Sequence, residues 1–454
     1  MKISIIGTGY VGLVTGTCLA EVGHNVTCVD IVKEKVNIIN NGKTPVYEPG
    51  LEELITKNIA ANRMRATTES RKAIVESDVT FICVGTPPKE NGDSDLSFVR
   101  KTSEDIGKAL AEKSEYHVIV VKSTVPPGTS RSLISIIEKQ SKKKARKDFG
   151  VCMNPEFLRE GCAVKDFMEP DRIVIGELDN KAGDLVSKIY YSFNAPILRS
   201  NLETAEMIKY TSNSLLSTLI SFSNEIGNIC ELVENVDVNT VLQAVHLDKR
   251  LSPIVGGKSN KPPITSYLKA GCGFGGSCFP KDVTAIIAFA KNKGYSPQLL
   301  CSVLQINRER PKRMLALLKR KLGELENKKI AILGLAFKPD TDDMRESPAV
   351  PLINLLLQEK ATLVTYDPQA VENAKKIWGT TIIYASSPED AIRGADACVL
   401  ITSWKEFHEI KPKTFKKLLK TPILIDGRRI YNPQEYSSML NYVGVGYTQK
   451  KNRR

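Results

Sequence analysis

Hydrophobic and polar positions over residues 2–30 predict a strand, a turn, a helix and a second strand. The run KISIIG (2–7) is almost continuously apolar, which is typical of a strand buried on both faces. After the turn GTGYVG, the run LVTGTCLAEVG (13–23) predicts a packed helix, and NVTCVD (25–30) predicts the next strand. Similar apolar runs follow at VTFICVG (79–85) and HVIVVKST (117–124). The pattern indicates a parallel sheet with helical crossovers.

The same pattern returns in the last third of the chain. KKIAILGLAF, PAVPLINLLLQEK and ATLVTYD repeat the order of strand, helix and strand from residue 328 to 367, and ADACVLITS and TPILIDG continue the second sheet. Between the halves, residues 201–236 keep apolar residues at three- and four-residue spacing, which predicts an unusually long helix. Its exposed apolar face is expected to need a partner, so we expect at least a homodimer.

We therefore predict an α/β fold of two Rossmann-like, doubly wound domains, joined by a long central helix and a helical dimerisation region. The expected domains are a dinucleotide-binding domain over 1–200, the helical region over 201–322, and a second Rossmann-like domain over 323–454.

The turn GTGYVG places Gly7, Gly9 and Gly12 in the G-x-G-x-x-G spacing of a dinucleotide-binding turn. Asp30 ends the second strand 18 residues after Gly12, where a ribose diol needs an acceptor. Because an acid there repels a 2′-phosphate, the pattern favours NAD over NADP. Asp367 stands at the same place in the second half, which keeps only one of the three glycines. That half is a candidate for a different nucleotide.

Two loops of the first half follow strands at TPP and TVPPGT and begin with Thr86 and Thr124. Loops at the carboxyl ends of parallel strands form the ligand crevice of open α/β sheets. The two threonines are therefore candidates to line a cofactor cleft. The alternative is that both loops are ordinary turns that end strands.

The stretch GCGFGGSCFPKD (271–282) carries the main chemical question. Glycines permit tight turns and close approach of another molecule, and Pro280 suits the first turn of a helix. Cys278 is therefore expected at a helix N-terminus, where a thiolate is favoured. Three uses are open: a nucleophile, a metal ligand and a phosphate-binding loop.

Spacing argues against two of these uses. Zinc sites need closely paired ligands, whereas Cys272 and Cys278 have five residues between them and no second pair follows. The histidines are scattered, at His24, His117, His246 and His408. No Gly-Lys-Ser/Thr ending marks a phosphate loop. A nucleophilic cysteine is favoured, and no metal site is expected.

Other polar residues occur in pairs four positions apart, and such pairs share one face of a helix. The pairs are Lys209 with Asn213 on the long helix, Cys278 with Asp282, and Glu156 with Glu160 in NPEFLREG. Taken alone, a lysine on an apolar helix usually extends its amine to solvent, and an asparagine usually bonds locally. Together with a cysteine and a bound NAD, these groups suit an oxidation in which a carbonyl is held covalently.

Composition limits the remaining classes of function. The chain has 454 residues, 42% of them hydrophobic, and a formal net charge of +13. Its lysines are dispersed, and the basic clusters SKKKARKD (141–148) and QKKNRR (449–454) lack interleaved aromatics, so neither nucleic acid nor a membrane is expected as a partner. No apolar run approaches the length of about 20 residues that spans a bilayer. Several of the ten cysteines lie in apolar strand-like runs, which favours a cytoplasmic protein without disulfides.

Nine motifs resemble the UDP-glucose/GDP-mannose dehydrogenase family, in the order seen in its UDP-glucose 6-dehydrogenases. They are GTGYVGL, VGTP, STVPPGT, NPEFLREGCAVKDFMEPDRIVIG, AEMIKYTSN, GFGGSCFPKD, GLAFKPDTDDMRESP, YDP and IDGRRIYN. The resemblance covers essentially the whole chain. It implies NAD on the first 200 residues, a UDP-sugar on the carboxyl-terminal half, and two successive oxidations of UDP-glucose to UDP-glucuronate.

The resemblance also implies roles for individual residues. Cys278 would be the nucleophile, Lys209 and Asn213 would stabilise oxyanions, Asp282 would order a water or the lysine, and Thr124 and Glu156 would serve water activation and hydrolysis. The cofactor side would comprise Gly7, Gly9, Tyr10, Val11, Gly12, Asp30, Lys33, Thr86, Thr124, Glu160, Lys281 and Arg345. The substrate side would comprise Glu156, Phe157, Leu158, Lys209, Asn213, Arg250, Tyr267, Phe274, Gly275, Lys338 and Arg428, with Arg429 as the alternative to Arg428.

One segment departs from the family. Residues 250–266 are an insertion before the glycine-rich loop, and Arg250 is the best match for the substrate arginine expected there. Two alternatives remain within the enzyme class, oxidation of GDP-mannose and of UDP-N-acetylmannosamine, although NPEFLREG and GFGGSCFPKD resemble the UDP-glucose branch more closely. A nucleotide-sugar sensor without turnover is the alternative from another class.

Overall fold

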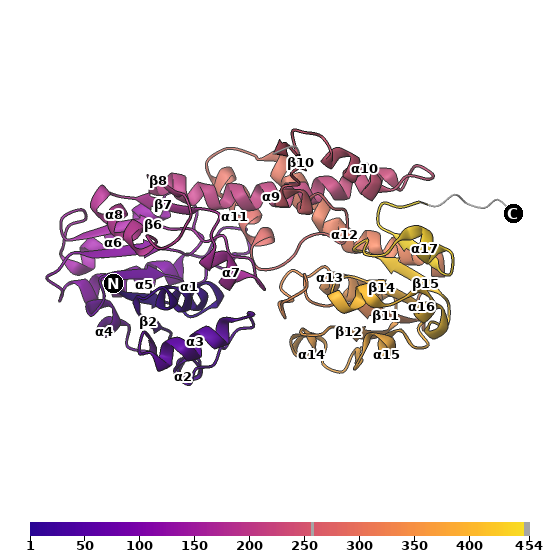
Figure 1. Cartoon of the computed structure of the whole chain (residues 1–454), viewed down its shortest axis with the longest axis horizontal. Coiled ribbons are helices and arrows are strands. Elements are labelled where there is room, and N and C mark those ends of the chain that lie inside the picture. The colour runs from indigo at the N-terminus through magenta and orange to yellow at the C-terminus, as the bar shows by residue number, and fades with distance from the viewer. Residues whose placement is uncertain (256–257, 449–454) are drawn as a thin grey trace. The chain divides into compact units, whose positions relative to one another are not determined.

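The computed structural model describes residues 1–255 and 258–448 (Figure 1). The chain forms two compact units, one of residues 1–212 with 284–294 and the other of residues 213–283 with the chain from 295 onward. The basic tail 449–454 and part of the 250–266 insertion lie outside the described residues. The predicted division into three domains stays a prediction.

The first unit is built on an eight-stranded sheet of order β3-β2-β1-β4-β5-β6-β7-β8. Its strands are parallel from β3 to β6, whereas β7 runs antiparallel to β6 and parallel to β8. The strands are β1 Lys2–Ile6, β2 Asn25–Val29, β3 Met64–Thr67, β4 Val79–Ile82, β5 His117–Val121, β6 Phe149–Met153, β7 Ile173–Glu177 and β8 Ile197–Asn201. The helices are α1 Tyr10–Glu21, α2 Lys33–Asn40, α3 Leu51–Ala60, α4 Ser70–Val75, α5 Ser97–Leu110, α6 Thr129–Ser141, α7 Ala163–Met168 and α8 Asn180–Ile189.

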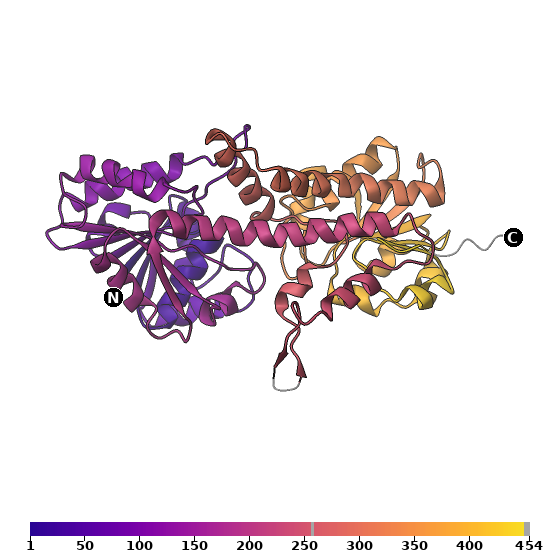
Figure 2. The same ribbon diagram turned by 90° about the horizontal axis from the view of Figure 1, so that it is seen from above.

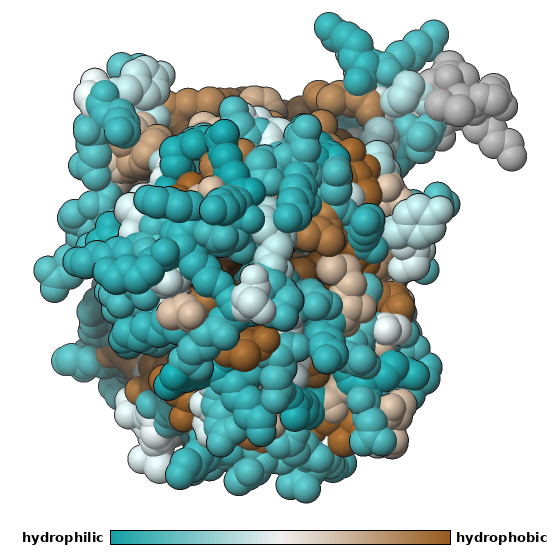
Figure 3. Space-filling view, turned by 90° about the vertical axis from the view of Figure 1, so that its left-hand side faces the viewer, coloured by the Kyte–Doolittle hydropathy of each residue, from teal (hydrophilic) through white to brown (hydrophobic). Residues whose placement is uncertain are grey.

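Helices cover both faces of this sheet, which is why its central strands β4 and β5 are buried along their whole length. In β5, Val118 and Val120 belong to one hydrophobic cluster, and Ile119 and Val121 belong to a second cluster on the other face. Successive side chains of a strand point to opposite faces, so a strand covered on both sides has no polar face. The outer surface shown in Figure 3 is mostly hydrophilic, with hydrophobic side chains in small separate areas.

The predicted long helix is present as α9, Leu202–Cys230, an unbroken rod of 29 residues (Figure 2). It is shorter than the predicted 201–236. The segments after it are α10 Val238–His246, the short antiparallel pair β9 Ile254–Val255 and β10 Lys258–Ser259, a 3₁₀ helix Pro263–Tyr267, α11 Phe279–Asn292 and α12 Gln298–Leu322.

The second unit contains a six-stranded parallel sheet of order β13-β12-β11-β14-β15-β16. The strands are β11 Lys329–Leu333, β12 Thr362–Tyr366, β13 Ile383–Tyr384, β14 Ala397–Leu400, β15 Ile423–Asp426 and β16 Asn441–Gly444. The helices are α13 Ala349–Gln358, α14 Val371–Trp378, α15 Pro388–Ile392, a 3₁₀ helix Lys405–Glu409, α16 Pro412–Leu418 and α17 Pro433–Ser437. The predicted α/β class with two Rossmann-like sheets is therefore confirmed.

The two sheets repeat one local detail at the end of their first strand. Gly7 has φ +98° and donates its N–H to the carbonyl of Val29, and Gly334 has φ +97° and donates to the carbonyl of Tyr366, both at 2.8 Å. Such a φ favours glycine. The units then diverge, because α1 begins at residue 10, whereas α13 begins only at residue 349.

Candidate functional site

The glycine-rich turn of the first unit leads directly from β1 into α1. A Cβ on Gly7 would lie 2.9 Å from the carbonyl oxygen of Cys83, and a Cβ on Gly12 would lie 1.9 Å from the carbonyl oxygen of Gly7. Both glycines are therefore required by the fold of the turn itself. Gly9 is different, because a Cβ there would meet nothing within 4 Å. This glycine leaves open space beside the N-terminus of α1, as the approach of a pyrophosphate requires.

Asp30 directly follows β2 and faces this turn. Its Oδ2 accepts hydrogen bonds from the amide and hydroxyl of Thr8, at 3.0 and 2.6 Å, and its Oδ1 accepts from the amide of Val32 at 3.0 Å. Burial opposes the charge, but these hydrogen bonds prevail and lower the pKa of Asp30. The turn and the ionised carboxylate fit the pyrophosphate and ribose of a dinucleotide. Tyr10 and Val11 open α1, and Lys33 opens α2.

The two threonine loops of the first unit are joined. Thr86, after β4, donates its hydroxyl to the carbonyl of Thr124, after β5, at 2.9 Å. Thr86 is buried and Thr124 is half-buried. The structure thus brings the two predicted threonines together at the carboxyl ends of adjacent strands.

Glu156 and Lys209 form an ion pair within the first unit, with 2.8 Å between Oε1 and Nζ. Their side chains are only 6% and 4% exposed. Burial opposes ionisation of the glutamate, but Lys209 and the amide of Leu158 lower its pKa. The ring of Phe157 lies against Lys209 and against Arg172, with 5.5 and 3.9 Å to the ring centroid. The sequence placed Glu156 and Lys209 in separate pairs, and the structure joins them.

A buried lysine beside this pair was missed in the sequence. Lys122, at the end of β5, donates to the side-chain oxygen of Asn154 at 2.9 Å, and Tyr190 donates to the same oxygen at 2.6 Å. Burial lowers the pKa of Lys122 to about 8. The charges of Glu156 and Lys209 act on it in opposite directions. Lys122 stands between apolar strand residues and a proline-rich turn, and nothing in that local sequence indicates that its side chain belongs to the site.

In the second unit, Cys278 directly precedes α11, as predicted, and its Sγ lies 3.6 Å from the hydroxyl oxygen of Ser277. Asp282 lies one turn further along and is almost completely buried. It accepts a hydrogen bond from the side-chain amide of Asn213 and another from Lys281, each at 2.6 Å. The structure therefore joins Asn213 of α9 to Asp282 of α11, the helix that begins directly after Cys278.

Side chains of two long helices hold the backbone of the glycine-rich loop. The side-chain amide of Asn307 accepts from the N–H of Phe274 at 2.8 Å and donates to its carbonyl at 2.9 Å. Asn224 accepts from the N–H of Gly271 at 2.7 Å, and Arg310 donates to its carbonyl at 2.8 Å. None of these three was predicted, because a polar residue on a long helix gives no sign of the distant loop that it contacts.

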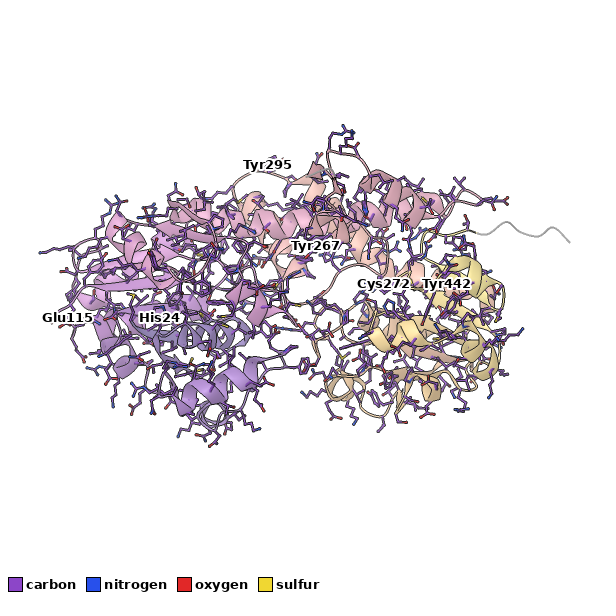
Figure 4. The ribbon with its side chains drawn as sticks, in the orientation of Figure 1. His24, Glu115, Tyr267, Cys272, Tyr295 and Tyr442 are labelled. Carbon is purple, nitrogen blue, oxygen red and sulfur yellow. The ribbon has the colours of Figure 1, made fainter. Side chains whose placement is uncertain are left out.

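Neighbouring backbone and rings explain why this loop needs its glycines. A Cβ on Gly275 would lie 2.3 Å from the carbonyl oxygen of Glu346, and one on Gly276 would lie 2.7 Å from the ring of Phe337. Cys272, labelled in Figure 4, is buried and donates to the carbonyl of Gly427 at 3.2 Å. This cysteine packs inside the second unit, whereas Cys278 is only half-buried.

The two arginines of DGRR have different surroundings. Arg428 donates to the carbonyls of Gly273 and Ile401, at 3.0 and 2.5 Å, so it contacts the glycine-rich loop. Arg429 is buried and pairs with Asp237 at 2.7 Å. The contact with the loop favours Arg428 as the arginine nearer to a ligand bound there.

The remaining predicted substrate and cofactor residues of this unit lie on separate segments of the chain. Arg250 is 89% exposed and pairs with Asp248 two residues before it, and Arg345 pairs with Asp343 at 2.8 Å. Tyr267 (Figure 4) lies 6.3 Å from the ring of Phe279, and Lys338 lies 5.6 Å from that of Phe337.

The described residues contain neither a cluster of metal ligands nor a helix that could span a membrane. Among residues 1–255 and 258–448, no group of three or more His, Cys, Asp or Glu side chains is placed to hold a metal ion. No helix in that part of the chain is both long and apolar enough to cross a membrane. All ten cysteines lie among these described residues, and none of them forms a disulfide there.

Family models match three consecutive regions of the chain. They are described as the NAD binding domain, the central domain and the UDP binding domain of the UDP-glucose/GDP-mannose dehydrogenase family, and they match residues 1–194, 203–309 and 331–433.

Individual relatives cover nearly the whole chain. It is 44% identical over 434 residues to UDP-glucose 6-dehydrogenase TuaD of Bacillus subtilis, which covers 96% of this chain and 90% of that protein. It is 40% identical over 426 residues to GDP-mannose 6-dehydrogenase of Pseudomonas aeruginosa, with 91% and 94% covered. A UDP-glucose dehydrogenase structure from Pyrobaculum islandicum matches with a TM-score of 0.89 at 36% identity and covers 98% of each chain.

These comparisons confirm the predicted family, the enzyme class and NAD as the cofactor. The second nucleotide-binding half, which the sequence separated from the first by its missing glycines, matches the family's UDP binding domain. The chain is an NAD-dependent oxidoreductase and belongs to the UDP-glucose/GDP-mannose dehydrogenase family.

Proposed function

We propose that this enzyme oxidises C6 of UDP-glucose twice, to UDP-glucuronate, with consumption of two NAD⁺ and one water. Relatives at 38–44% identity that carry the name UDP-glucose 6-dehydrogenase support this substrate. The GDP-mannose enzyme is 40% identical, within the same range, so overall identity does not separate the two substrates. The motifs NPEFLREG and GFGGSCFPKD favour UDP-glucose.

One set of connections carries the proposal. Lys209 and Asn213 are four residues apart on the continuous helix α9. Asn213 donates to Asp282 at 2.6 Å, and Asp282 lies four residues after Cys278 at the start of α11. Within the second unit, a buried hydrogen bond and a helix turn therefore connect Asn213 to the proposed nucleophile. Binding of a nucleotide sugar without turnover would not require such a connection, which argues against a sensor.

Cys278 is the group that we propose to hold the aldehyde between the two oxidations. A free aldehyde could leave the enzyme or become hydrated, whereas attack by a thiolate converts it into a thiohemiacetal bound to Sγ. The second oxidation leaves a thioester, and water then releases the carboxylate and restores the thiol. The N-terminus of α11 favours the thiolate form of a cysteine beside it.

Lys209 is proposed to stabilise the negative charge that develops on the C6 oxygen. A charged donor in a site with little water acts strongly on such an oxyanion. The buried Glu156 carboxylate holds the ammonium group in place. Asn213 is proposed as a second donor, and Asp282 orients it through their hydrogen bond. Thr124 and Glu156 are proposed to position the water of hydrolysis.

The first unit supplies the proposed NAD site, and NAD⁺ bound there would supply the hydride acceptor for each oxidation. The space beside Gly9 and the ionised Asp30 carboxylate fit the pyrophosphate and ribose. We propose Tyr10, Val11, Lys33, Thr86, Thr124 and Glu160 as other cofactor residues of this unit. Lys281 and Arg345, which belong to the second unit, are proposed as cofactor residues from the family motifs alone.

On the substrate side, we propose the loop residues Phe274 and Gly275, with Arg428, Lys338, Tyr267, Phe157 and Leu158. Arg428 contacts the loop through Gly273, which supports its assignment over Arg429. Arg250 remains a proposal from the motif alone, because its guanidinium pairs with its near neighbour Asp248.

A homodimer is proposed through α9. Leu215, Phe222 and Ile229 are about half exposed and recur every seven residues, so they form one apolar stripe on this helix. An exposed stripe of this kind is typical of a protein interface. We also propose that the enzyme works in the cytoplasm, where its free thiols would stay reduced.

A panel of nucleotide sugars tests the proposed substrate. UDP-glucose, UDP-N-acetylmannosamine and GDP-mannose are supplied at equal concentration with NAD, and NADH formation is followed by absorbance. We expect kcat/KM for UDP-glucose to exceed the other two by at least about 10²-fold. A higher kcat/KM for another nucleotide sugar would make that sugar the substrate in place of UDP-glucose. If none of the three produced NADH, the protein would instead be a nucleotide-sugar sensor.

A further inference from the structure

Glu48 is a buried carboxylate that the proposed function leaves without a role. It lies in the loop between α2 and α3 and is only 5% exposed. Its Oε2 accepts the hydroxyl of Tyr10 and the N–H of Gly161, the latter at 2.7 Å. Its Oε1 accepts the N–H groups of Ala163 and Val164, at 2.7 and 3.4 Å. Four donors from two separate segments therefore converge on one carboxylate.

The two segments belong to different parts of the proposed site. Tyr10 is the first residue of α1 and part of the glycine-rich turn. Gly161 ends the loop NPEFLREG (154–161), and α7 begins two residues later. The Gly161 amide also donates to the Tyr10 hydroxyl at 3.1 Å. Burial, Glu48 and, less strongly, Glu160 raise the pKa of Tyr10, so its hydroxyl remains a donor at any physiological pH.

The other end of this loop has its own anchor. Asn154 accepts from Lys122 and Tyr190 and donates to the carbonyl of Val174 at 2.8 Å. None of these three partners belongs to the glycine-rich turn. Glu48 therefore joins the loop to the turn, together with the direct bond from the Gly161 amide to the Tyr10 hydroxyl, and it acts at the end of the loop that carries Glu160.

We propose that Glu48 is a positioning residue that couples the NAD-binding turn to the loop 154–161. Movement of Tyr10 when NAD binds is transmitted through the carboxylate to the amides of 161–164. The loop in turn carries Glu156, the partner of Lys209, and Glu160. The coupling requires both carboxylate oxygens, because one faces the turn and the loop, and the other faces the start of α7. It rests on the proposed roles of Glu156 and Glu160.

Hydrogen–deuterium exchange of the full chain, with and without NAD alone, measures this coupling. In the parent protein, NAD should slow exchange of the amides of 161–164 by about 10-fold or more, because it holds the turn to which they are linked. In Glu48→Gln, the amide nitrogen replaces one acceptor by a donor, and NAD should slow the same amides by less than about 3-fold. The kcat with the preferred sugar nucleotide should fall by about 10- to 100-fold, because small displacements of positioned groups are costly.

Tyr10→Phe is the milder variant and guards against a folding failure of Glu48→Gln. It removes only the hydroxyl, so the amides of 161–164 should stay slow without NAD but lose their response to it. Glu53→Gln on α3 is the matched control, since Glu53 is an exposed carboxylate that should leave exchange and kcat unchanged.

The proposal is overturned if NAD leaves the amides of 161–164 unchanged in the parent protein. It is equally overturned if NAD slows the exchange of these amides in Glu48→Gln as much as in the parent protein. If Glu48→Gln does not fold, the same result in Tyr10→Phe overturns it. Because this measurement needs no sugar nucleotide and no reaction at Cys278, its result is independent of the proposed substrate and mechanism.

Discussion

Asp30 and Asp367 occupy the same place in the two Rossmann-like units, directly after the second strand of each repeat, but their surroundings differ. Asp30 accepts three hydrogen bonds from Thr8 and Val32 and remains partly exposed. Asp367 is 2% exposed, and its two oxygens accept five hydrogen bonds. The five donors are the amides of Leu335, Ala336, Gln369 and Ala370 and the indole N–H of Trp404.

The difference follows from the turn that each acid faces. In the first unit, α1 begins three residues after Gly7, so its free N–H groups lie beside the turn. In the second unit, the fifteen residues 334–348 separate β11 from α13, and the first amides of this segment bond to Asp367. An acid at the end of a strand therefore has acceptor capacity for a ribose only where the turn leaves its oxygens available, which agrees with the role that we propose for Asp30. In the second unit the acid stabilises the loop that replaced the turn.

The largest expected effect separates the nucleophile, which we propose in the second unit, from cofactor binding in the first. Cys278→Ser should lower kcat by at least about 10³-fold, because a serine oxygen is a far weaker nucleophile at neutral pH. Binding of NAD and of UDP-glucose, measured by calorimetry, should stay within a few-fold of the parent values.

Cys272→Ser is its matched control, six residues earlier and packed inside the second unit. It should keep kcat within about 10-fold of the parent value, since it changes one buried hydrogen bond. Near-normal turnover by the serine variant at 278, or an inactive Cys272→Ser, would refute the assignment of the nucleophile.

Asp367→Ala tests the structural side of the comparison. It leaves five donors without their acceptor and should destabilise the second unit by about 3–5 kcal/mol. Trp378 and Trp404 are the only tryptophans of the chain and both lie in this unit, so denaturant unfolding followed by tryptophan fluorescence reports on it selectively. An unfolding curve like that of the parent would show that this acid is not structural.

Lys209→Ala tests the buried ion pair between Lys209 and Glu156 in the first unit. We expect kcat to fall by about 10²–10³-fold with the KM for UDP-glucose within a few-fold, as when one oxyanion donor is lost. Steady-state kinetics separate the two constants. A change confined to KM would make Lys209 a binding residue only.

Asp30→Ala should have the smallest effect and the opposite signature from Asp367→Ala. It should weaken NAD binding by about 10-fold and reduce the preference against NADP, because the carboxylate both accepts ribose hydroxyls and repels a 2′-phosphate. The tryptophan unfolding curve should not move. An unchanged ratio of the NAD and NADP dissociation constants would count against the assigned role.

Local patterns made much of the fold predictable from the sequence. Apolar runs buried on both faces gave the strands, and the glycine spacing gave the first turn, because both depend on residues that are close along the chain. The position of Cys278 before α11 followed from the proline two residues later. The repeat of strand, helix and strand indicated the second sheet for the same reason.

The contacts that join distant segments could not be predicted from local pattern. Glu48 bonds to residues 38 and 113 positions away, and Asn307 bonds to Phe274, 33 positions away. Their neighbourhoods, VYEPG and QINRE, resemble ordinary loop and helix surfaces. Likewise, the sequence pattern did not distinguish Asp30 from Asp367, because the donors to Asp367 come from three separate segments whose courses no periodicity specifies.

The ratio of NADH formed to UDP-glucose consumed tests the central claim, a double oxidation in which Cys278 retains the intermediate. The parent enzyme is given limiting UDP-glucose and excess NAD, NADH is measured by absorbance, and the products are separated by chromatography. The account predicts two NADH for each UDP-glucose, with UDP-glucuronate as the product and no aldehyde at any time. One NADH for each UDP-glucose, together with a released aldehyde, would contradict it.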